Sequence, residues 1–431
     1  MTLPCRGRLR WMFGVVCCVA ILFVMGLAVW INQHMPVKRH GGIIFEIDEY
    51  SLEEKGKKVN ISDTNVMTTE RRPFQETTLG NTYAITLKAS EKLDNLNSSS
   101  LNLREATHDK NGTFKFCSLN PTDLVGNLAC KCNETTPEEI LRDNAGLIQE
   151  GRVQPLDCIA MEKVAIVIPY RDRYKHLHQL LSMLIPILSR QKVDATIFVV
   201  EQVGPVLFNR GALHNVGFLE AEKLGKFDCY IFHDVDLVPL NDQQMYSCGD
   251  NPIHFSVAIK YGLSQHFRQV IATLLIMYKA NFGGVVGLTR DQYLALNGNS
   301  NLYFGWGGED DDLAARLNVH NMTKLRRSLS ITRYAMLGHQ RQNVVNGNPA
   351  RNNILKTAKQ RMNIDGLNTI EYVLHNLNIH PLYVWFNVTL LMKEMFQSAP
   401  DFLQNEITMM TKLEEKKARA LLIKSPSRQI H

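Results

Sequence analysis

Residues 164–200 read VAIVIPYRDRYKHLHQLLSMLIPILSRQKVDATIFVV, and this segment decides the fold. Val164–Pro169 and Thr196–Val200 are short, continuous apolar runs, which are typical of strands buried on both faces. Arg173–Arg190 between them has leucines at helical spacing, and a second amphipathic helix, Asn209–Leu224, precedes the strand Tyr230–His233. This alternation predicts a three-layer α/β domain with a mainly parallel sheet. Right-handed crossovers bring the carboxyl ends of parallel strands to one edge, where ligands usually bind.

The composition of the whole chain excludes several classes of protein. The 431 residues are 45% apolar and 21% charged, and the formal net charge is +6. This length is ample for a large core, and the composition excludes collagen, a low-complexity chain and a polytopic membrane protein. The positive charge is too weak and too dispersed for a nucleic-acid surface, so we expect no nucleic-acid partner.

The amino-terminal region predicts a membrane anchor. Residues 11–31 carry no charge and have the length of a membrane-spanning helix, with arginines before them. A cleaved signal peptide would have a shorter apolar region and a small-x-small cleavage site, and neither is evident. We therefore expect a single-pass type II membrane protein with its body outside the cytosol. Asn-x-Ser/Thr sequons at six positions support this orientation (Asn60, Asn97, Asn111, Asn133, Asn321 and Asn387).

The expected organisation has five parts. Residues 32–115 are polar and poor in aromatic side chains, which predicts a flexible, glycosylated stem, with a small domain as the alternative. The apolar strand and helix patterns fall within the next part, and the chain becomes polar and basic after it. The predicted parts are a cytosolic tail (1–10), a signal-anchor (11–31), the stem (32–115), a catalytic domain (116–390) and a loosely helical or disordered tail (391–431).

Two acidic residues follow a buried strand directly. Asp234 and Asp236 are two positions apart, so in an extended segment their side chains project to the same side. At a carboxyl edge of the sheet, such a pair can hold a divalent cation together with a diphosphate. The alternative is an ordinary solvated loop.

A second acidic motif spans residues 304–312 and reads FGWGGEDDD. An acidic surface patch is the usual explanation for four consecutive carboxylates. Here, however, glycines and an aromatic residue precede them and a helical pattern follows at residues 313–317, so the acids would lie at a helix amino terminus, which stabilises negative charge. A third motif, Met336 with His339, offers a thioether and an imidazole that suit a transition metal better than Mg²⁺, although such a pair is usually part of a core.

Taken together, the motifs resemble those of the β-1,4-galactosyltransferase family. The segments that carry the resemblance occur in the family's order and span the region from about residue 117 to 389: FNRGALHNVGF (208–218), HDVDLVP (233–239), NFGGVVGL (281–288), GWGGEDDD (305–312) and DGLN (365–368). The resemblance implies a GT-A type fold, with a Rossmann-like mixed sheet flanked by helices, and a Golgi type II anchor. It also implies a Mn²⁺-dependent, inverting transfer from a UDP-sugar to the 4-hydroxyl of a terminal GlcNAc-type acceptor.

The resemblance assigns roles by position. The metal ligands would be Asp236, Met336 and His339, and Asp310 would be the base. The donor would contact Pro169, Tyr170, Arg171, Arg173, Phe208, Arg210, Asp234, Val235, Lys260, Asn281 and Trp306. The acceptor would contact Gly307, Gly308, Glu309, Asp311, Arg351 and Asp365. The implied disulfides are Cys117–Cys158 and Cys229–Cys248, whereas Cys130 and Cys132 have no family counterpart.

Three departures from the family pattern concern specificity. Asn281 replaces a tyrosine that limits an N-acetyl group on the donor, so either UDP-Gal or UDP-GalNAc remains possible. Residues 264–279 contain about ten extra residues of apolar character, which are either a real added element or an error in the gene product, and which would inactivate the protein if they disrupt the sheet. Arg351-Asn352 replaces Arg-Phe, and losing the aromatic face should weaken GlcNAc stacking. The alternatives to an active transferase are a catalytically impaired, membrane-anchored carbohydrate-binding homologue and a UDP-sugar hydrolase.

Overall fold

The structure is a computed structural model that describes residues 115–130, 134–260, 274–338 and 347–424, all within one compact unit. The predicted anchor at residues 11–31, nearly all of the expected stem, Cys132 and His339 lie outside the described residues. Within the described ranges, no helix has both the length and the apolar character needed to cross a membrane.

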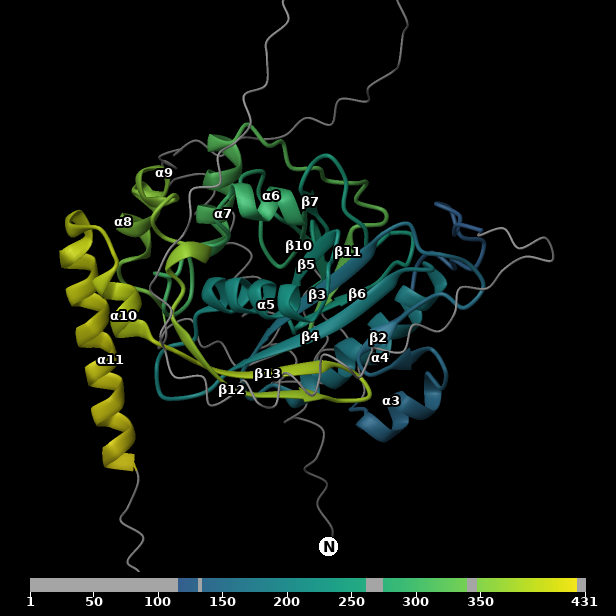
Figure 1. Cartoon of the computed structure of the whole chain (residues 1–431), viewed down its shortest axis with the longest axis horizontal. Coiled ribbons are helices and arrows are strands. Elements are labelled where there is room, and N and C mark those ends of the chain that lie inside the picture. Colours follow the sequence, from purple (N-terminus) through teal and green to yellow (C-terminus); the bar gives the residue numbers. More distant parts are fainter. Residues whose placement is uncertain (1–114, 131–133, 261–273, 339–346, 425–431) are drawn as a thin grey trace, which may run out of the picture. The chain divides into compact units, whose positions relative to one another are not determined.

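A nine-stranded mixed sheet forms the centre of the described unit (Figure 1). Its parallel core is β3 (Lys163–Tyr170), between β4 (Asp194–Gln202) and β5 (Cys229–His233). Beside β4 run β13 (Val384–Leu390), which is parallel to it, and β2 (Arg152–Val153), which is antiparallel. Antiparallel strands complete both edges: β1 (Ile148–Gln149), β7 (Ile253–His254), β10 (Val285–Thr289) and β12 (Tyr372–Ile379).

Each face of the parallel core packs against a long helix. Successive side chains of a strand point to opposite faces. Ala165 and Val167 of β3 therefore share one core cluster with residues of α5 (Arg210–Leu224), whereas Ile166 and Ile168 pack with residues of α4 (Tyr174–Arg190). The predicted α/β class with helices on both faces of a mixed sheet is confirmed, and each predicted element over residues 164–233 agrees with the structure to within two residues at either end. The prediction of a mainly parallel sheet is wrong, because in the main sheet only β3–β4, β3–β5 and β4–β13 pair in parallel.

A smaller four-stranded sheet lies beside the main one, in the order β6-β11-β8-β9. Its strands are β6 (Leu237–Pro239), β8 (Ala258–Lys260), β9 (Leu274–Ile276) and β11 (Arg333–Met336). The apolar insert predicted at residues 264–279 thus contributes β9, which pairs antiparallel with β8. The strand β9 lies at the edge of the small sheet.

Short helices surround the sheets: α3 (Pro137–Asp143), α6 (Arg290–Ala295), α7 (Glu309–Val319), α8 (Arg351–Lys356), α9 (Ala358–Arg361), α10 (Met392–Gln397) and the 3₁₀ turns at Leu367–Thr369 and Asp401–Leu403. The last helix, α11 (Gln404–Lys424), is drawn in yellow beside α10 in Figure 1. The predicted end of the folded domain at residue 390 is too early, because Met395, Leu403, Ile407 and Met410 are all buried in the main core. These apolar residues are widely spaced in a polar and basic stretch, so the composition of the stretch does not indicate that they are buried.

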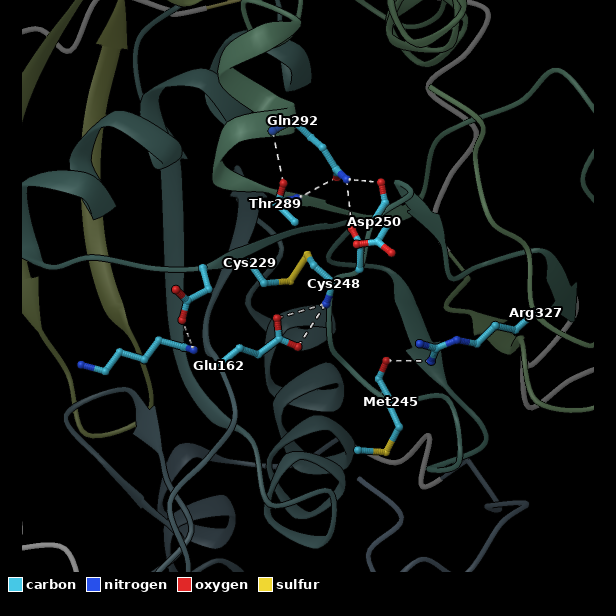
Figure 2. The surroundings of a disulfide bond; sticks show 11 residues. Glu162, Cys229, Met245, Cys248, Asp250, Thr289, Gln292 and Arg327 are labelled. Carbon is cyan, nitrogen blue, oxygen red and sulfur yellow. Dashed lines mark hydrogen bonds between the residues drawn. A yellow bond between two sulfur atoms is a disulfide. The ribbon is translucent and has the colours of Figure 1, made fainter. Parts of the chain in front are cut away.

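Both expected disulfides are present, Cys117–Cys158 and Cys229–Cys248, and Cys130 is disulfide-bonded as well. Figure 2 shows the second disulfide and the groups around it. The Glu162 carboxylate accepts a hydrogen bond from the backbone N–H of Cys248, and the Gln292 amide donates to the carbonyls of Gly249 and Asp250. These contacts fix the loop between β6 and β7 against the end of the sheet.

Candidate active site

The predicted site residues lie where the parallel strands end. Tyr170 ends β3, Gln202 ends β4, and Asp234 follows β5 directly. Because the three strands are parallel neighbours, their carboxyl ends share one edge of the sheet. Tyr170 and Asp234, both predicted to contact the nucleotide, are therefore on the same edge of the sheet, although 64 positions separate them along the chain.

Arg210 is the centre of this edge. Its preceding residue, Asn209, caps α5 by accepting a hydrogen bond from the N–H of Ala212 at 3.0 Å, which sets the direction in which Arg210 leaves the helix. The guanidinium lies 2.6 Å from the Asp234 carboxylate, 2.8 Å from Glu309 and 2.6 Å from Asp310. One cation thus joins the acidic motif after β5 to the acidic motif at the start of α7.

Burial controls the protonation of this cluster. Burial raises the pKa of Asp310 to about 7, against the attraction of Arg210, and Glu309 and Asp234 raise it further. Burial likewise raises the pKa of Asp234 to about 6, with Arg210 opposing and Asp236 adding to the rise. Burial alone would lower the pKa of Arg210, but the three carboxylates outweigh it and raise that pKa well above its usual value. A carboxylate with a pKa near neutrality is suited to accept a proton.

The four acids of α7 serve different neighbours because successive helix residues point about 100° apart. Glu309 and Asp310 face Arg210, and Asp311 accepts a hydrogen bond from the Tyr278 hydroxyl at 2.6 Å. Asp312 points inward and is fully buried, with hydrogen bonds from Tyr303, Arg316 and Arg361. The EDDD motif therefore contributes its first three acids to the candidate site and its fourth, Asp312, to the buried core.

Glycines at two positions allow the close packing around Asp310 and the backbone conformation of the turn before α7. A Cβ atom on Gly283 would lie only 2.0 Å from the Asp310 carboxyl carbon, so only glycine allows this approach. Gly308 caps α7 with a φ of +105°, which strongly favours glycine. Gly283 was quoted within NFGG as part of the resemblance, but its contact with Asp310 was not foreseen.

Trp306 and Arg351 form an exposed rim beside this turn. The Trp306 ring is 54% exposed, and the Arg351 guanidinium lies 5.8 Å from its centre. Asn348 donates its backbone N–H to the Trp306 carbonyl at 3.1 Å. Gly307, predicted to contact the acceptor, lies between Trp306 and Gly308 and next to the Arg351 side chain.

In the small sheet, the backbones of two of the three expected metal ligands lie close together. β11 is antiparallel to β6, and Met336 pairs with Leu237, the residue after Asp236. One carboxylate oxygen of Asp236 lies 3.2 Å from the Arg173 guanidinium, so this oxygen already faces a positive charge. A carboxylate and a thioether together would suit a transition metal such as Mn²⁺, and His339, the third expected ligand, lies outside the described residues. Within the described ranges, no group of three His, Cys, Asp or Glu side chains could hold a metal ion.

The remaining donor residues frame the same edge. The Arg171 guanidinium lies over the Phe208 ring at 5.4 Å, and Pro169 and Tyr170 form the end of β3. Lys260 ends β8, next to β11 in the small sheet. Val235 is buried in the apolar core, and Asn281 is 4% exposed, with no hydrogen-bond partner for its side-chain oxygen among the described residues. The backbone of this last turn is held by Arg326, which donates to the carbonyls of Met277, Tyr278 and Asn281.

Asp365 has a different environment from the one expected for an acceptor contact. It is 3% exposed, and its carboxylate accepts hydrogen bonds from Ser300, from the backbone of Asn301 and from Arg361. Its oxygens are therefore engaged in a buried network that fixes the segment before α7. Glu309, another expected acceptor contact, is 8% exposed and pairs with Arg210. It therefore lies with the residues expected to bind the donor and not at the exposed rim formed by Trp306 and Arg351.

Several residues of the site were not singled out from the sequence. They are Tyr278, Gly283, Arg326 and Gln202, which contacts the chain before α5. The repeated NFGG glycines were a usable signal. The others were not detectable because their roles come from contacts between segments that are far apart in the sequence.

Comparisons with known proteins define the class of this chain. Residues 117–249 match the family described as the N-terminal region of glycosyl transferase group 7, and residues 270–340 match the N-terminal domain of galactosyltransferase. The chain is 40% identical to beta-1,4-galactosyltransferase 2 of Mus musculus over 276 residues, which cover 63% of this chain and 71% of that protein. It is 44% identical over 227 residues to a beta-N-acetyl-D-glucosaminide beta-1,4-N-acetylglucosaminyl-transferase of Lymnaea stagnalis, with 52% and 44% of the two chains covered.

The chain therefore belongs to the β-1,4-galactosyltransferase family, and it is a hexosyltransferase. Among solved structures, it is similar to the catalytic domain of a Drosophila β-1,4-galactosyltransferase 7 in complex with xylobiose. That similarity has a TM-score of 0.44 and 28% identity, and it covers 53% of this chain and 94% of the other. The family resemblance inferred from the motifs is thus confirmed.

Proposed function

We propose that the protein transfers Gal or GalNAc from a UDP-sugar to the 4-hydroxyl of a terminal GlcNAc-type acceptor, with inversion at the anomeric carbon. The observation that carries this proposal is the Arg210 cluster. It joins the nucleotide-side carboxylate Asp234 to Asp310, a carboxylate whose pKa near 7 suits proton transfer at neutral pH.

A single displacement needs only groups that this edge of the sheet offers. The acceptor hydroxyl gives its proton to an oxygen of Asp310 while its own oxygen forms the bond to the anomeric carbon. The bond from that carbon to the UDP oxygen breaks, and UDP leaves with the electron pair. No covalent enzyme intermediate is needed, because one in-line attack inverts the configuration.

Donor binding would divide between two groups of residues. Arg171, Phe208 and the other residues at the ends of β3 and β4 would hold the nucleoside part, and Arg173 and Lys260 would face the diphosphate. Mn²⁺ would be held by Asp236, Met336 and His339, and it would neutralise charge on the diphosphate as UDP departs. We also propose a GT-A type fold and a Golgi membrane location through the segment at residues 11–31.

Asn281 bears on the choice of donor. Its side chain is buried, yet its oxygen lacks a hydrogen-bond partner within the described residues, so it can accept one from a ligand group. An N-acetyl N–H is a donor of this kind, and a hydroxyl is another. For this reason, both UDP-Gal and UDP-GalNAc belong to the proposal.

The test uses the full-length protein with MnCl₂, a GlcNAc-terminated acceptor, and UDP-Gal or UDP-GalNAc in parallel, with product detection by mass spectrometry. The proposal predicts an extended acceptor with at least one donor. No product with either donor would refute the transferase and favour a carbohydrate-binding homologue. UDP release that does not depend on the acceptor would instead indicate a hydrolase.

A further inference from the structure

The carboxyl-terminal helix α11 contacts the proposed donor site. The helix lies outside both family matches, which end at residue 340. Ile407 and Met410 of this helix are buried in the main core, and Leu413 packs against it. The helix is thus anchored along one side, with Glu414 one position after the last of these apolar contacts.

Glu414 is buried, with 8% of its surface exposed. One of its carboxyl oxygens accepts a hydrogen bond from the backbone N–H of Leu207 at 2.5 Å, and Leu207 is itself only 2% exposed. A buried backbone N–H that loses its acceptor costs far more than an exposed one, because water cannot replace the bond. This long-range contact spans 207 positions of sequence, and the sequence gives no local signal for it.

The segment that Glu414 holds is the loop between β4 and α5. Gln202 accepts a hydrogen bond from the N–H of Asn209 and donates to the Leu207 carbonyl at 3.0 Å. Arg171 donates to the Val206 carbonyl at 3.0 Å and lies over the Phe208 ring. Burial lowers the pKa of Arg171, and the negative charges of Asp172, Glu414 and Glu201 oppose that decrease.

The same helix reaches the Trp306 rim. The Asn348 side chain donates to the Met410 sulfur at 3.6 Å, and the Asn348 backbone N–H donates to the Trp306 carbonyl. On α8, the side chain of Asn353 donates to Glu406 at 3.0 Å. Figure 1 shows α8 close to the upper end of α11. The helix therefore supports two separate walls of one site.

We propose that Glu414 is a positioning residue for the UDP part of the donor, acting through its hydrogen bond with the backbone N–H of Leu207. This inference rests on the proposed function, because it assigns the Val206–Phe208 loop to the nucleotide. Leu207 is followed by Phe208, Asn209 and Arg210, so a shift of its backbone moves the ring, the helix cap and the central guanidinium together. Glu414 touches none of the reacting atoms, so donor affinity depends on it more than turnover does.

The experiment compares four forms of the full-length protein: wild type, Glu414→Ala, Glu414→Gln and Glu415→Ala. Calorimetric titration with UDP in the presence of MnCl₂ gives the Kd, and initial rates give KM for the donor and kcat. Loss of the buried acceptor is expected to raise Kd and the donor KM about tenfold in Glu414→Ala, with kcat changed less than about twofold. Glu414→Gln keeps an oxygen that can accept the bond, so it should restore most of the affinity. Glu415 is exposed on the same helix, and its alanine variant should behave like the wild type.

The outcomes separate this inference from the proposed function. If Glu414→Ala is folded and binds UDP within about twofold of the wild type, the inference is overturned while the transferase proposal stands. If Glu414→Ala does not fold, Glu414→Asp replaces it in the comparison. Its carboxyl is one methylene further from the N–H of Leu207, so Glu414→Asp should bind UDP several-fold more weakly than Glu414→Gln. Equal affinities of these two variants would overturn the inference, and a wild type that binds no UDP would contradict both proposals.

Discussion

The pH dependence of kcat/KM for the donor tests Asp310 in quantitative terms. Burial raises the pKa of this carboxyl to about 7, so it is ionised and able to accept a proton only above that pH. Activity is therefore about half-maximal at pH 7, nearly full above about pH 8, and lost as the pH falls through the pKa. With one group titrating, each pH unit below 7 removes about a factor of ten, which gives about one-tenth of the activity at pH 6 and about one-hundredth at pH 5.

Replacing the group should remove both the activity and its pH dependence. Asp310→Asn is expected to lower kcat by about 10²–10⁴, the usual contribution of a general base, and the residual rate should not fall tenfold per unit below pH 7. Arg210 keeps Asp234 and Glu309 as partners in this variant, so UDP binding should persist. Initial rates from pH 5 to 9 measure the profile, with Asp291→Asn at an exposed position as the control. A wild-type profile that is flat down to pH 5, or an Asp310→Asn variant with near-normal kcat, would refute the assignment of Asp310 as the base.

Three further predictions test specificity and stability. Asn281→Tyr places a larger side chain at a buried position of the proposed donor site. In parallel assays, the ratio of kcat/KM for UDP-Gal to kcat/KM for UDP-GalNAc should rise about tenfold. An unchanged ratio would exclude Asn281 as the residue that selects the donor sugar. Burial raises the pKa of Glu162 to about 7, so the folded state binds its proton more tightly than the unfolded state, and this contribution to stability is lost as the pH rises from about 4.5 through 7. In urea titrations with the disulfides intact, Glu162→Gln should therefore have a free energy of unfolding about 1–3 kcal/mol above that of the wild type at pH 8, but no such gain at pH 4.5. The same gain in the free energy of unfolding at both pH values would contradict this. Asp312→Asn leaves two buried guanidinium groups short of a counter-charge and should lower the free energy of unfolding by about 3–5 kcal/mol, whereas Asp311→Asn should affect activity more than stability.

The parallel core was predictable because its signals are local. Continuous apolar runs such as Val164–Pro169 mark strands buried on both faces, and leucine spacing marks α4 between them. The antiparallel strand β10 and the small sheet were not predicted, because pairing partners such as Met336 and Leu237 are far apart in the sequence. Strand direction and register depend on those partners, which no local pattern specifies.

The identities of the site residues were largely predictable from the sequence, whereas the contacts between these residues were only partly predictable. The motifs indicated Asp234, Asp236 and Asp310 by residue type and by their position after a strand or at a helix start. Their shared partner Arg210 was expected to contact the nucleotide, yet its ion pairs with three carboxylates come from tertiary packing. The contact between Glu414 and Leu207 was not predictable either. Glu414 lies in a segment of polar and basic composition, in which no local pattern indicates a buried carboxylate.

The central claim is that this edge of the sheet performs a single in-line transfer of a hexose to a 4-hydroxyl. The most direct measurement is the NMR spectrum of the product formed from an α-linked UDP-sugar and a GlcNAc-terminated acceptor. The account predicts a β-anomeric proton and a linkage to position 4 of the acceptor sugar. A product with an α-linkage would contradict the single displacement with Asp310 as base.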